Sequence, residues 1–205
     1  MTGVQTCALP ICVLSYSQIV RAAFALGHAL KEGTKPGDAV GILLPTGIGA
    51  VIAFFAILAY GRIPAMLNFT AGQRNLRTAL EMTKTKRIVS ARRFIELGKL
   101  DALVADLSSM ADLIYLEDVR DNLSFVSKIF GLAGNFVPWA LRAATQPRDP
   151  AVILFTSGTE GEPKGVALSH ANILTNIEQV RIHIALTPTD VVFNPLPTFH
   201  SLGLT

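Results

Sequence analysis

Short apolar runs alternate with helix-length segments along most of this 205-residue chain. Runs of about four to eight apolar residues bounded by turn residues are typical of strands buried in a parallel sheet. We expect strands at 40–44, 63–69, 87–91, 112–118, 151–155 and 165–170, and helices at 15–31, 50–60, 74–83, 92–107 and 171–185. Ser15 or Ser17 is the expected N-cap of the first helix. Strands alternating with helices predict an α/β fold, a layered domain with a mostly parallel sheet and helices on both faces.

The composition excludes several classes of protein, among them disordered chains and nucleic-acid-binding proteins. Half of the residues are apolar and 16% are charged, so the chain can bury a core rather than remain disordered. A net charge of +3 is too small to indicate a nucleic-acid partner. Both cysteines, Cys7 and Cys12, lie at a spacing that fits neither a metal site nor a redox motif, which indicates a reducing, cytoplasmic location. Residues 1–12 lack the basic start of a signal peptide, and we interpret them as a non-native leader.

One segment, 39–61, has 23 residues without a charge, which is long enough for a membrane span. Pro45, Gly47 and Gly49 interrupt it near its start. We therefore predict a buried strand followed by a buried helix, with a membrane span as the alternative.

The stretch 121–148 departs from the alternation of strands and helices. It mixes apolar residues with sparse positive charge and contains the only tryptophan of the chain, Trp139. We interpret it as an ordinary packed helix and loop. An amphipathic helix that touches a membrane face is the alternative.

Charged residues gather in two further places. The stretch 73–99 has eight basic residues and two acidic ones, which indicates either solvated helix faces or a docking surface for an acidic partner. The neighbouring acids Glu117 and Asp118 are interpreted as a solvated strand end rather than a general acid–base pair.

The stretch 155–170, "FTSGTEGEPKGVALSH", has the composition of a loop built around an anion. Gly158, Gly161 and Gly165 allow backbone N–H groups to point into one concavity, hydroxyl side chains add donors, and Lys164 adds a positive charge. The spacing fits neither the Walker A pattern nor the dinucleotide fingerprint. The sequence therefore predicts a phosphate-binding loop of another kind.

Two motifs in this region carry a family resemblance. "FTSGTEGEPKGV" resembles the signature of the adenylate-forming synthetases, except that Glu160 stands where threonine or serine is commoner. "NPLPTFHSLGLT" resembles the second motif of that family. The resemblance implies that residues 13–205 are the N-terminal portion of an AMP-binding adenylation domain, whose C-terminal remainder lies outside this chain. A polypeptide of this extent is expected to have no ligase activity alone.

The resemblance also implies a reaction and a site. Such enzymes join a carboxylic acid to ATP, with Mg²⁺, and then transfer the acyl group from acyl-AMP to a thiol. Lys164 and His200 would be catalytic, with His200 and Phe199 bordering the carboxylate, and no protein metal ligand is assigned. The residues expected to bind the phosphates of ATP are Thr156, Ser157, Gly158, Thr159, Gly161 and Lys164.

Within the family, Glu160 together with "YGRIPAMLNFTAG", "YLED" and "LPTFHSLGLT" is similar to one branch. That branch joins an acyl-acyl-carrier-protein synthetase to a 2-acylglycerophosphoethanolamine acyltransferase. It implies a fatty acid and acyl carrier protein as partners, lysophospholipid reacylation, and contact with the inner face of a bacterial membrane. A long-chain fatty acyl-CoA ligase using CoA is the first alternative, and a non-catalytic nucleotide-binding module is the second.

Overall fold

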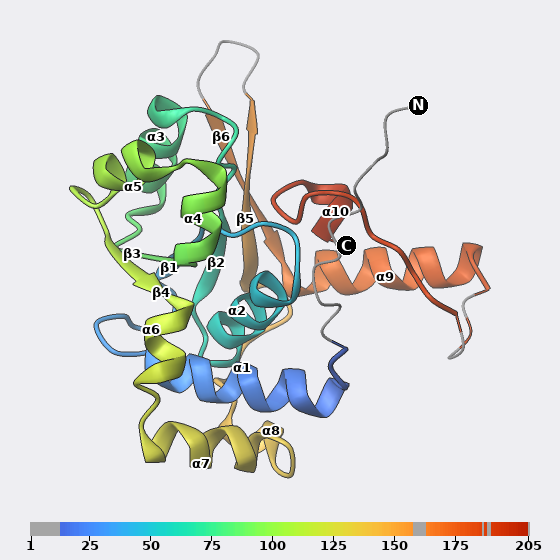
Figure 1. Cartoon of the computed structure of the whole chain (residues 1–205). Helices are drawn as coiled ribbons and strands as arrows, with labels where there is room; N and C mark the ends of the chain where they lie inside the picture. Colours follow the sequence, from blue (N-terminus) through green and yellow to red (C-terminus); the bar gives the residue numbers. More distant parts are fainter. Residues whose placement is uncertain (1–12, 158–162, 186, 188–189, 205) are drawn as a thin grey trace, which may run out of the picture.

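The computed structural model describes residues 13–157, 163–185, 187 and 190–204. The described strands form a six-stranded sheet in the order β4-β3-β1-β2-β5-β6 (Figure 1). Every neighbouring pair is parallel except β5 and β6, which pair antiparallel. The strands are β1 (Ala39–Ile42), β2 (Ile63–Met66), β3 (Arg87–Ser90), β4 (Asp112–Tyr115), β5 (Pro150–Ser157) and β6 (Pro163–Ser169).

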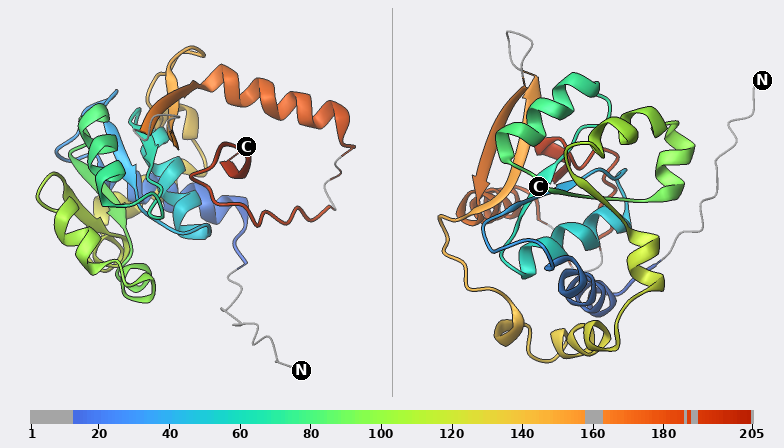
Figure 2. Two further views of the ribbon diagram at one scale, coloured as in Figure 1. Left: turned by 90° about the horizontal axis from the view of Figure 1, so that it is seen from above. Right: turned by 90° about the vertical axis from the view of Figure 1, so that its left-hand side faces the viewer.

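Helices cover both faces of this sheet (Figures 1 and 2). On one face lie α1 (Tyr16–Leu30) and α2 (Ile48–Ala59), and on the other lie α3 (Gln73–Thr83), α4 (Arg92–Gly98) and α5 (Asp101–Leu107). The remaining helices are α6 (Leu116–Asp121), α7 (Phe125–Gly134), α8 (Pro138–Leu141), α9 (His170–His183) and α10 (Ser201–Leu204). The sequence prediction of an α/β layered domain is confirmed.

Two apolar clusters, one on each face of the sheet, form the core. Ile42 and Leu44 belong to the cluster under α1 and α2, whereas Leu43 belongs to the cluster under α3 and α5. Ile88 and Val89 divide between the two clusters in the same way. Successive side chains of a strand point to opposite faces, so a strand covered on both sides needs a continuous apolar run.

The first helix begins as the sequence predicts. Ser15 is its N-cap, and the side chains of Ser15 and Gln18 form a reciprocal capping box. Such a box satisfies two of the N–H groups that a helix start leaves without partners.

Three predicted elements are wrong in their extent. The strand expected at 63–69 ends at Met66. The single helix expected at 92–107 is two helices, because Lys99 takes a left-handed conformation (φ 51°) and ends α4. The N–H groups of Lys99 and Leu100 donate to the carbonyls of Glu96 and Ile95, which closes the helix end as a Schellman motif. The strand expected at 112–118 ends at Tyr115, and α6 begins at Leu116.

The uncharged segment 39–61 folds as the strand β1 and the helix α2, as predicted. Within the described residues, no helix combines the length and apolar character that crossing a bilayer requires. The buried face of α2 consists of small residues and one isoleucine, namely Ala50, Ala53, Ala56 and Ile57. The helix α1 approaches α2 closely at Gly27, where an added Cβ atom would lie 2.5 Å from the carbonyl oxygen of Ala56.

Candidate functional site

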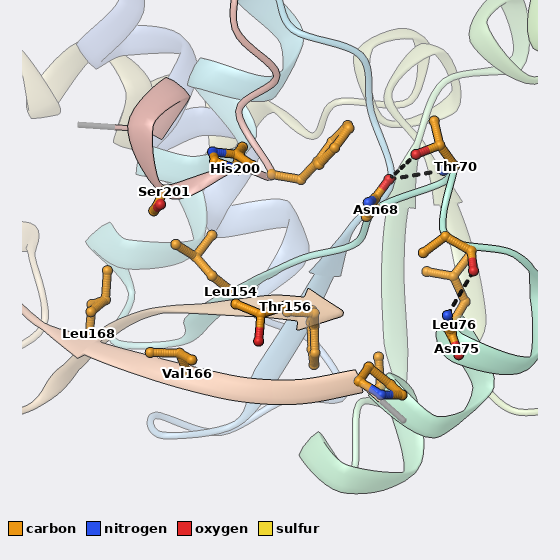
Figure 3. Close-up of a pocket in the computed structure, with 15 residues that line it drawn as sticks. Asn68, Thr70, Asn75, Leu76, Leu154, Thr156, Val166, Leu168, His200 and Ser201 are labelled. Carbon is orange, nitrogen blue, oxygen red and sulfur yellow. Dashed lines mark hydrogen bonds between the residues drawn. The ribbon is translucent and has the colours of Figure 1, made fainter. Parts of the chain in front are cut away.

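A cavity of about 490 Å³ lies where the carboxyl ends of β2 and β5 meet. The chain leaves β2 through α3 toward β3 on one side, and it leaves β5 toward β6 on the other. Adjacent strands whose connections diverge in this way open a crevice at their carboxyl ends, where α/β proteins bind ligands. The cavity is lined by Asn68, Thr70, Ala71, Asn75, Leu76, Ala79, Leu154, Phe155, Thr156, Pro163, Val166, Leu168, Phe199, His200 and Ser201 (Figure 3).

The hairpin of β5 and β6 places two of the predicted phosphate-binding residues together. Thr156 and Lys164 are directly opposite each other in the antiparallel register. Opposite residues in such a pair share one face of the sheet, with Cβ atoms about 5 Å apart. Val166 shares that face because side chains alternate along a strand, and it lines the cavity. Both Thr156 and Lys164 are exposed, so the hydroxyl and the ammonium are accessible beside the cavity.

Several predicted site residues lie outside the described residues. These are Gly158, Thr159 and Gly161, together with Glu160 and the side chain of Ser157. Their assignment to phosphate binding stays a prediction.

The segment that carries His200 is held at the cavity by Thr46, a residue far away in sequence. The Oγ1 of Thr46, which follows β1, donates to the carbonyl of Leu196 (3.3 Å) and accepts from the N–H of Thr198 (3.2 Å). These two bonds hold the segment 196–200 against the carboxyl end of the sheet. His200 and Ser201 consequently face Leu154 and Thr156 across the cavity (Figure 3).

An aromatic cluster supports the same side of the site. The ring centroids of Phe199 and Phe69 are 5.3 Å apart, and those of Phe69 and Phe94 are 5.0 Å apart, both in edge-to-face geometry. Edge-to-face pairs are favourable because a positive ring edge meets a negative ring face. The three phenylalanines come from the second motif, the end of β2 and α4, and they join these elements at the cavity.

The polar residues at the carboxyl end of β2 were not predicted from the sequence. The Oδ1 of Asn68 accepts hydrogen bonds from the N–H (2.9 Å) and the Oγ1 (2.7 Å) of Thr70. The Nδ2 of Asn75 donates to the carbonyl of Ala71 (2.9 Å). The sequence feature that could have indicated them is Asn68, which directly follows a buried apolar run. Ligand-binding residues gather at the carboxyl ends of the strands in a parallel sheet.

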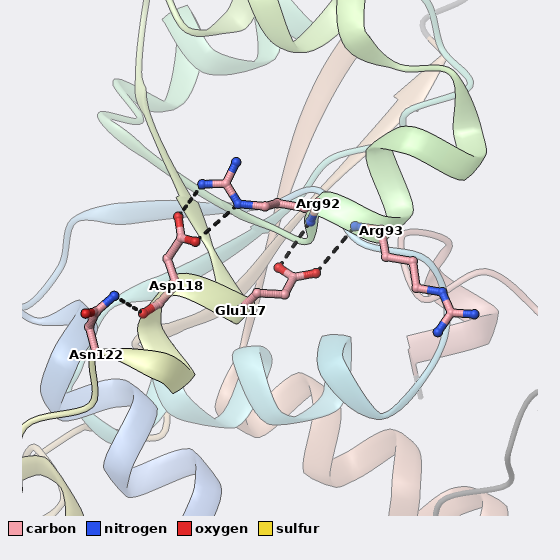
Figure 4. A network of polar contacts seen from close by, with 5 residues as sticks. All are labelled: Arg92, Arg93, Glu117, Asp118 and Asn122. Carbon is pink, nitrogen blue, oxygen red and sulfur yellow. Dashed lines mark hydrogen bonds and ion pairs between the residues drawn. The ribbon is translucent and has the colours of Figure 1, made fainter.

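The acids Glu117 and Asp118 form a network with α4 (Figure 4). The carboxylate of Glu117 accepts from the backbone N–H groups of Arg92 (3.1 Å) and Arg93 (3.4 Å) at the start of α4. Asp118 forms an ion pair with Arg92 (2.6 Å), and this hydrogen-bonded contact raises the pKa of the guanidinium. The guanidinium also lies 4.1 Å from the ring centroid of Tyr115.

These contacts decide how the two acids are interpreted. Glu117 and Asp118 are exposed or half-exposed, and their carboxylates already accept hydrogen bonds from backbone N–H groups or from Arg92. The two acids therefore link α4 to α6 rather than act as an acid–base pair. The prediction that they mark a strand end is wrong, because they occupy the first turn of α6. Negative side chains are favoured there by the helix dipole.

The described residues contain no group of three or more His, Cys, Asp or Glu side chains that could hold a metal ion. What the cavity does combine is an exposed hydroxyl, a nearby ammonium, an imidazole and an apolar wall. An ammonium and hydroxyl groups suit a phosphate, and an apolar wall suits a hydrocarbon group.

Comparison with known sequences places these features in a family. The family described as AMP-binding enzyme matches residues 8–205. The chain is 27% identical over 193 residues to a medium-chain fatty-acid–CoA ligase of Escherichia coli (strain K12), covering 92% of this chain and 34% of the ligase. It is 27% identical over 220 residues to a long-chain fatty-acid–CoA ligase of Bacillus subtilis (strain 168), covering 94% of this chain and 39% of the ligase. The chain thus spans about a third of the length of the curated relatives it matches.

A solved structure shares the fold. The fatty acyl-adenylate ligase from L. pneumophila, in complex with acyl adenylate and pyrophosphate, superposes with a TM-score of 0.72 at 24% identity. The superposition covers 93% of this chain and 31% of that one.

Proposed function

We propose that this chain, which belongs to the family of AMP-binding enzymes, is the N-terminal portion of the adenylation domain of a fatty-acid ligase. The ligase would form acyl-AMP from a fatty acid and ATP and then transfer the acyl group to a thiol. The observation that carries the proposal is the pairing of Thr156 with Lys164 beside a cavity that His200 borders on its other side. The two fatty-acid–CoA ligases among its relatives support the substrate class.

The first step brings two anions together, the carboxylate of the fatty acid and the α-phosphate of ATP. ATP with Mg²⁺ supplies the adenylyl group and a pyrophosphate leaving group. The carboxylate is the nucleophile, so the protein needs none of its own. Its task is to neutralise negative charge and to hold the carboxylate and the α-phosphate in the geometry of attack. Lys164 provides the positive charge at the phosphates, and the hydroxyl of Thr156 donates a hydrogen bond beside it.

The other side of the cavity holds the carboxylic acid. His200 and Phe199 border the carboxylate, and Asn68 and Thr70 present polar atoms at the rim. Leu154, Val166 and Leu168 form an apolar wall suited to the first carbons of the chain. The carboxylate of the fatty acid would thus lie against polar residues, and its hydrocarbon chain against apolar ones.

Acyl carrier protein is the proposed acceptor, in a ligase that serves lysophospholipid reacylation at the inner face of a bacterial membrane. The basic stretch 73–99 favours this acidic partner, although two of its cations are already paired, Arg77 with Asp106 (2.8 Å) and Arg92 with Asp118 (2.6 Å). CoA is the alternative acceptor, and the relatives that are CoA ligases favour it.

The test uses the full reading frame that contains this chain. Purified protein is incubated with ATP, Mg²⁺ and fatty acids of several lengths, with either acyl carrier protein or CoA, and thioester products are measured by mass spectrometry. Acyl carrier protein acylated without CoA is the expected product. Acyl-CoA alone would identify a CoA ligase, and the absence of thioester and acyl-AMP from folded protein would favour a non-catalytic nucleotide-binding module.

A further inference from the structure

The helix α7 exposes its large apolar side chains. Phe125, Ile129 and Leu132 follow one another at helical spacing along one face, with exposed fractions of 76%, 49% and 51%. Residues at i, i+4 and i+7 form one continuous stripe on a helix. The ribbon places α7 as a layer beyond α1 (Figure 1). Because the buried residues of α7 lie on its other side, against α1, the stripe points away from the sheet.

The opposite face of α7 consists of small residues and is buried. Ser127, Gly131 and Gly134 contact α1. A Cβ atom added to Gly131 would lie 2.8 Å from the carbonyl oxygen of Arg21, and one added to Gly134 would lie 2.4 Å from the ring of Phe24. The two helices therefore touch where only small residues fit. The helix cannot turn its large residues inward without losing this contact.

Polar contacts fix the same orientation. The Oγ of Ser127 is 3.0 Å from the Nδ1 of His28 on α1, and it is also bonded to the Oγ of Ser124 (2.9 Å), the N-cap of α7. The ring of Phe130 stacks on His28 with centroids 4.3 Å apart. The outward position of the apolar stripe is thus a consequence of specific packing.

The exposed surface continues past the end of α7. Phe136 and Trp139 are exposed by 69% and 67%, on the turn into α8 and on α8 itself. We name this surface the α7–α8 face, and it consists of Phe125, Val126, Ile129, Leu132, Phe136, Val137 and Trp139. Soluble monomers rarely expose large contiguous apolar patches, and such patches mark interaction sites.

The segment that carries the α7–α8 face has basic residues between two flanking acids, Asp121 and Asp149. Residues 122–148 include Lys128, Arg142 and Arg148 and no acidic residue. All three basic residues are exposed. A partner that offers hydrocarbon beneath a layer of negative charge would complement this surface.

We propose that the α7–α8 face docks on an anionic lipid bilayer, with its aromatic and aliphatic side chains among the acyl chains and its basic residues at the headgroups. A tryptophan, large apolar residues and flanking cations are the features of helices that lie in the membrane interface. At ten residues α7 is too short to cross a bilayer, so it lies along the surface. This inference extends the membrane location proposed above and does not require ligase activity.

The single tryptophan of the chain reports on the contact directly. The protein of the full reading frame is mixed with phosphatidylcholine vesicles that contain or lack phosphatidylglycerol. Co-sedimentation is measured, together with the Trp139 fluorescence taken as the difference from a Trp139→Phe variant. We expect a blue shift and sedimentation with the anionic vesicles, reduced by added salt and weak with the neutral ones. Wild-type protein that binds neither kind of vesicle would overturn the proposal.

Two sets of variants locate the contact. Phe125→Gln, Ile129→Gln and Leu132→Gln combined should lower the partition coefficient about 1,000-fold, at about tenfold for each apolar side chain lost from the acyl region. Lys128→Gln with Arg142→Gln should lower it about 25-fold on anionic vesicles, at about fivefold per basic residue. The matched control is Met82→Gln with Leu97→Gln, two exposed apolar residues on α3 and α4 (50% and 71%), which should leave binding unchanged.

Circular dichroism first establishes that each variant is folded. If the triple variant binds vesicles as well as wild type, the α7–α8 face is not the docking surface. If wild type is a lipid-free dimer that the triple variant converts to a monomer, a second copy covers this face and the proposal is wrong. Thioester formation is measured separately, so the ligase and the docking surface can fail independently.

Discussion

The β5–β6 hairpin and the α7–α8 face both present side chains to the outside, but they differ in kind. The hairpin exposes Thr156 and Lys164 beside a cavity at the carboxyl end of the sheet. The α7–α8 face exposes aromatic and aliphatic residues on the outer layer beyond α1. Polar groups above strand ends suit chemistry on a phosphate, whereas an apolar face with nearby basic residues suits attachment. The two proposed tasks thus lie on separate elements, so each can be removed without the other.

The largest expected effect is at the hairpin. In the full reading frame, Lys164→Ala should lower the rate of acyl-AMP formation about 100-fold, the loss typical of removing one preorganised group that stabilises developing charge. Vesicle binding should not change. Lys86→Ala, which removes an exposed lysine beside β3, is the control and should form acyl-AMP at the wild-type rate. Equal rates for both variants would remove Lys164 from the phosphate site.

A second prediction tests the packing that holds the α7–α8 face outward. Gly131→Ala would place a Cβ atom 2.8 Å from the backbone oxygen of Arg21 and 2.9 Å from the Cβ of Ala25, neither of which is a flexible side-chain end. Overpacking of this kind costs about 1–3 kcal/mol of unfolding free energy. Urea denaturation measures the loss.

The matched control for that variant is Gly49→Ala on α2. Its added Cβ atom would meet only the Cδ1 of Leu116, at 3.3 Å, which can move aside. We expect unchanged or slightly raised stability, because alanine favours the helix by about 1 kcal/mol over glycine. A stability loss as large for Gly49→Ala as for Gly131→Ala would contradict the close packing of α7 on α1.

A third prediction concerns pH at the same contact. Burial against α7, and next the charge of Lys31, lower the pKa of His28 below its usual 6.5, while Glu32 opposes them. The folded state thus favours the neutral ring, and the stability that this contributes is present above pH 6.5 and is lost as the pH falls through the folded pKa. Thermal melts at pH 7.5 and 5.5 should show a larger loss for wild type than for His28→Gln. Identical losses would show that His28 does not titrate differently on folding.

The smallest effect is expected at the network between α4 and α6. Arg92→Gln removes an ion pair whose side chains are both about half exposed. Water screens such a pair, so exposed ion pairs contribute little to stability. The melting temperature, vesicle binding and adenylation should all stay close to wild type. A large loss of adenylation would mean that this network positions the site.

The sequence predicted the strands of the sheet but not the hairpin of β5 and β6. Buried strands such as 87–91 need apolar residues on both faces, and that requirement appears as a continuous run. The antiparallel pairing of β6 was not predictable from its residues, because an apolar run looks the same in either direction. The break at Lys99 was missed because the left-handed position is held by lysine, with Gly98 one residue earlier.

The site was predictable only where residues adjacent in sequence form it. Lys164 and Thr156 belong to one motif, and the hairpin brings them together. The order of strands in the sheet brings Asn68 and Thr70 to the cavity, and it brings Thr46 to the segment that carries His200. No local sequence pattern reveals that order. The orientation of α7 could not be predicted for a related reason. Helical periodicity gives an apolar face and a small-residue face but does not say which of them is buried.

The most direct test of the central claim is exchange of labelled pyrophosphate into ATP by the full reading frame, with and without a long-chain fatty acid. Exchange measures reversible acyl-AMP formation and needs no thiol acceptor, so it is independent of the choice between acyl carrier protein and CoA. We expect exchange that requires the fatty acid and that Lys164→Ala lowers. Folded wild-type protein that gives no exchange with any carboxylic acid would contradict it.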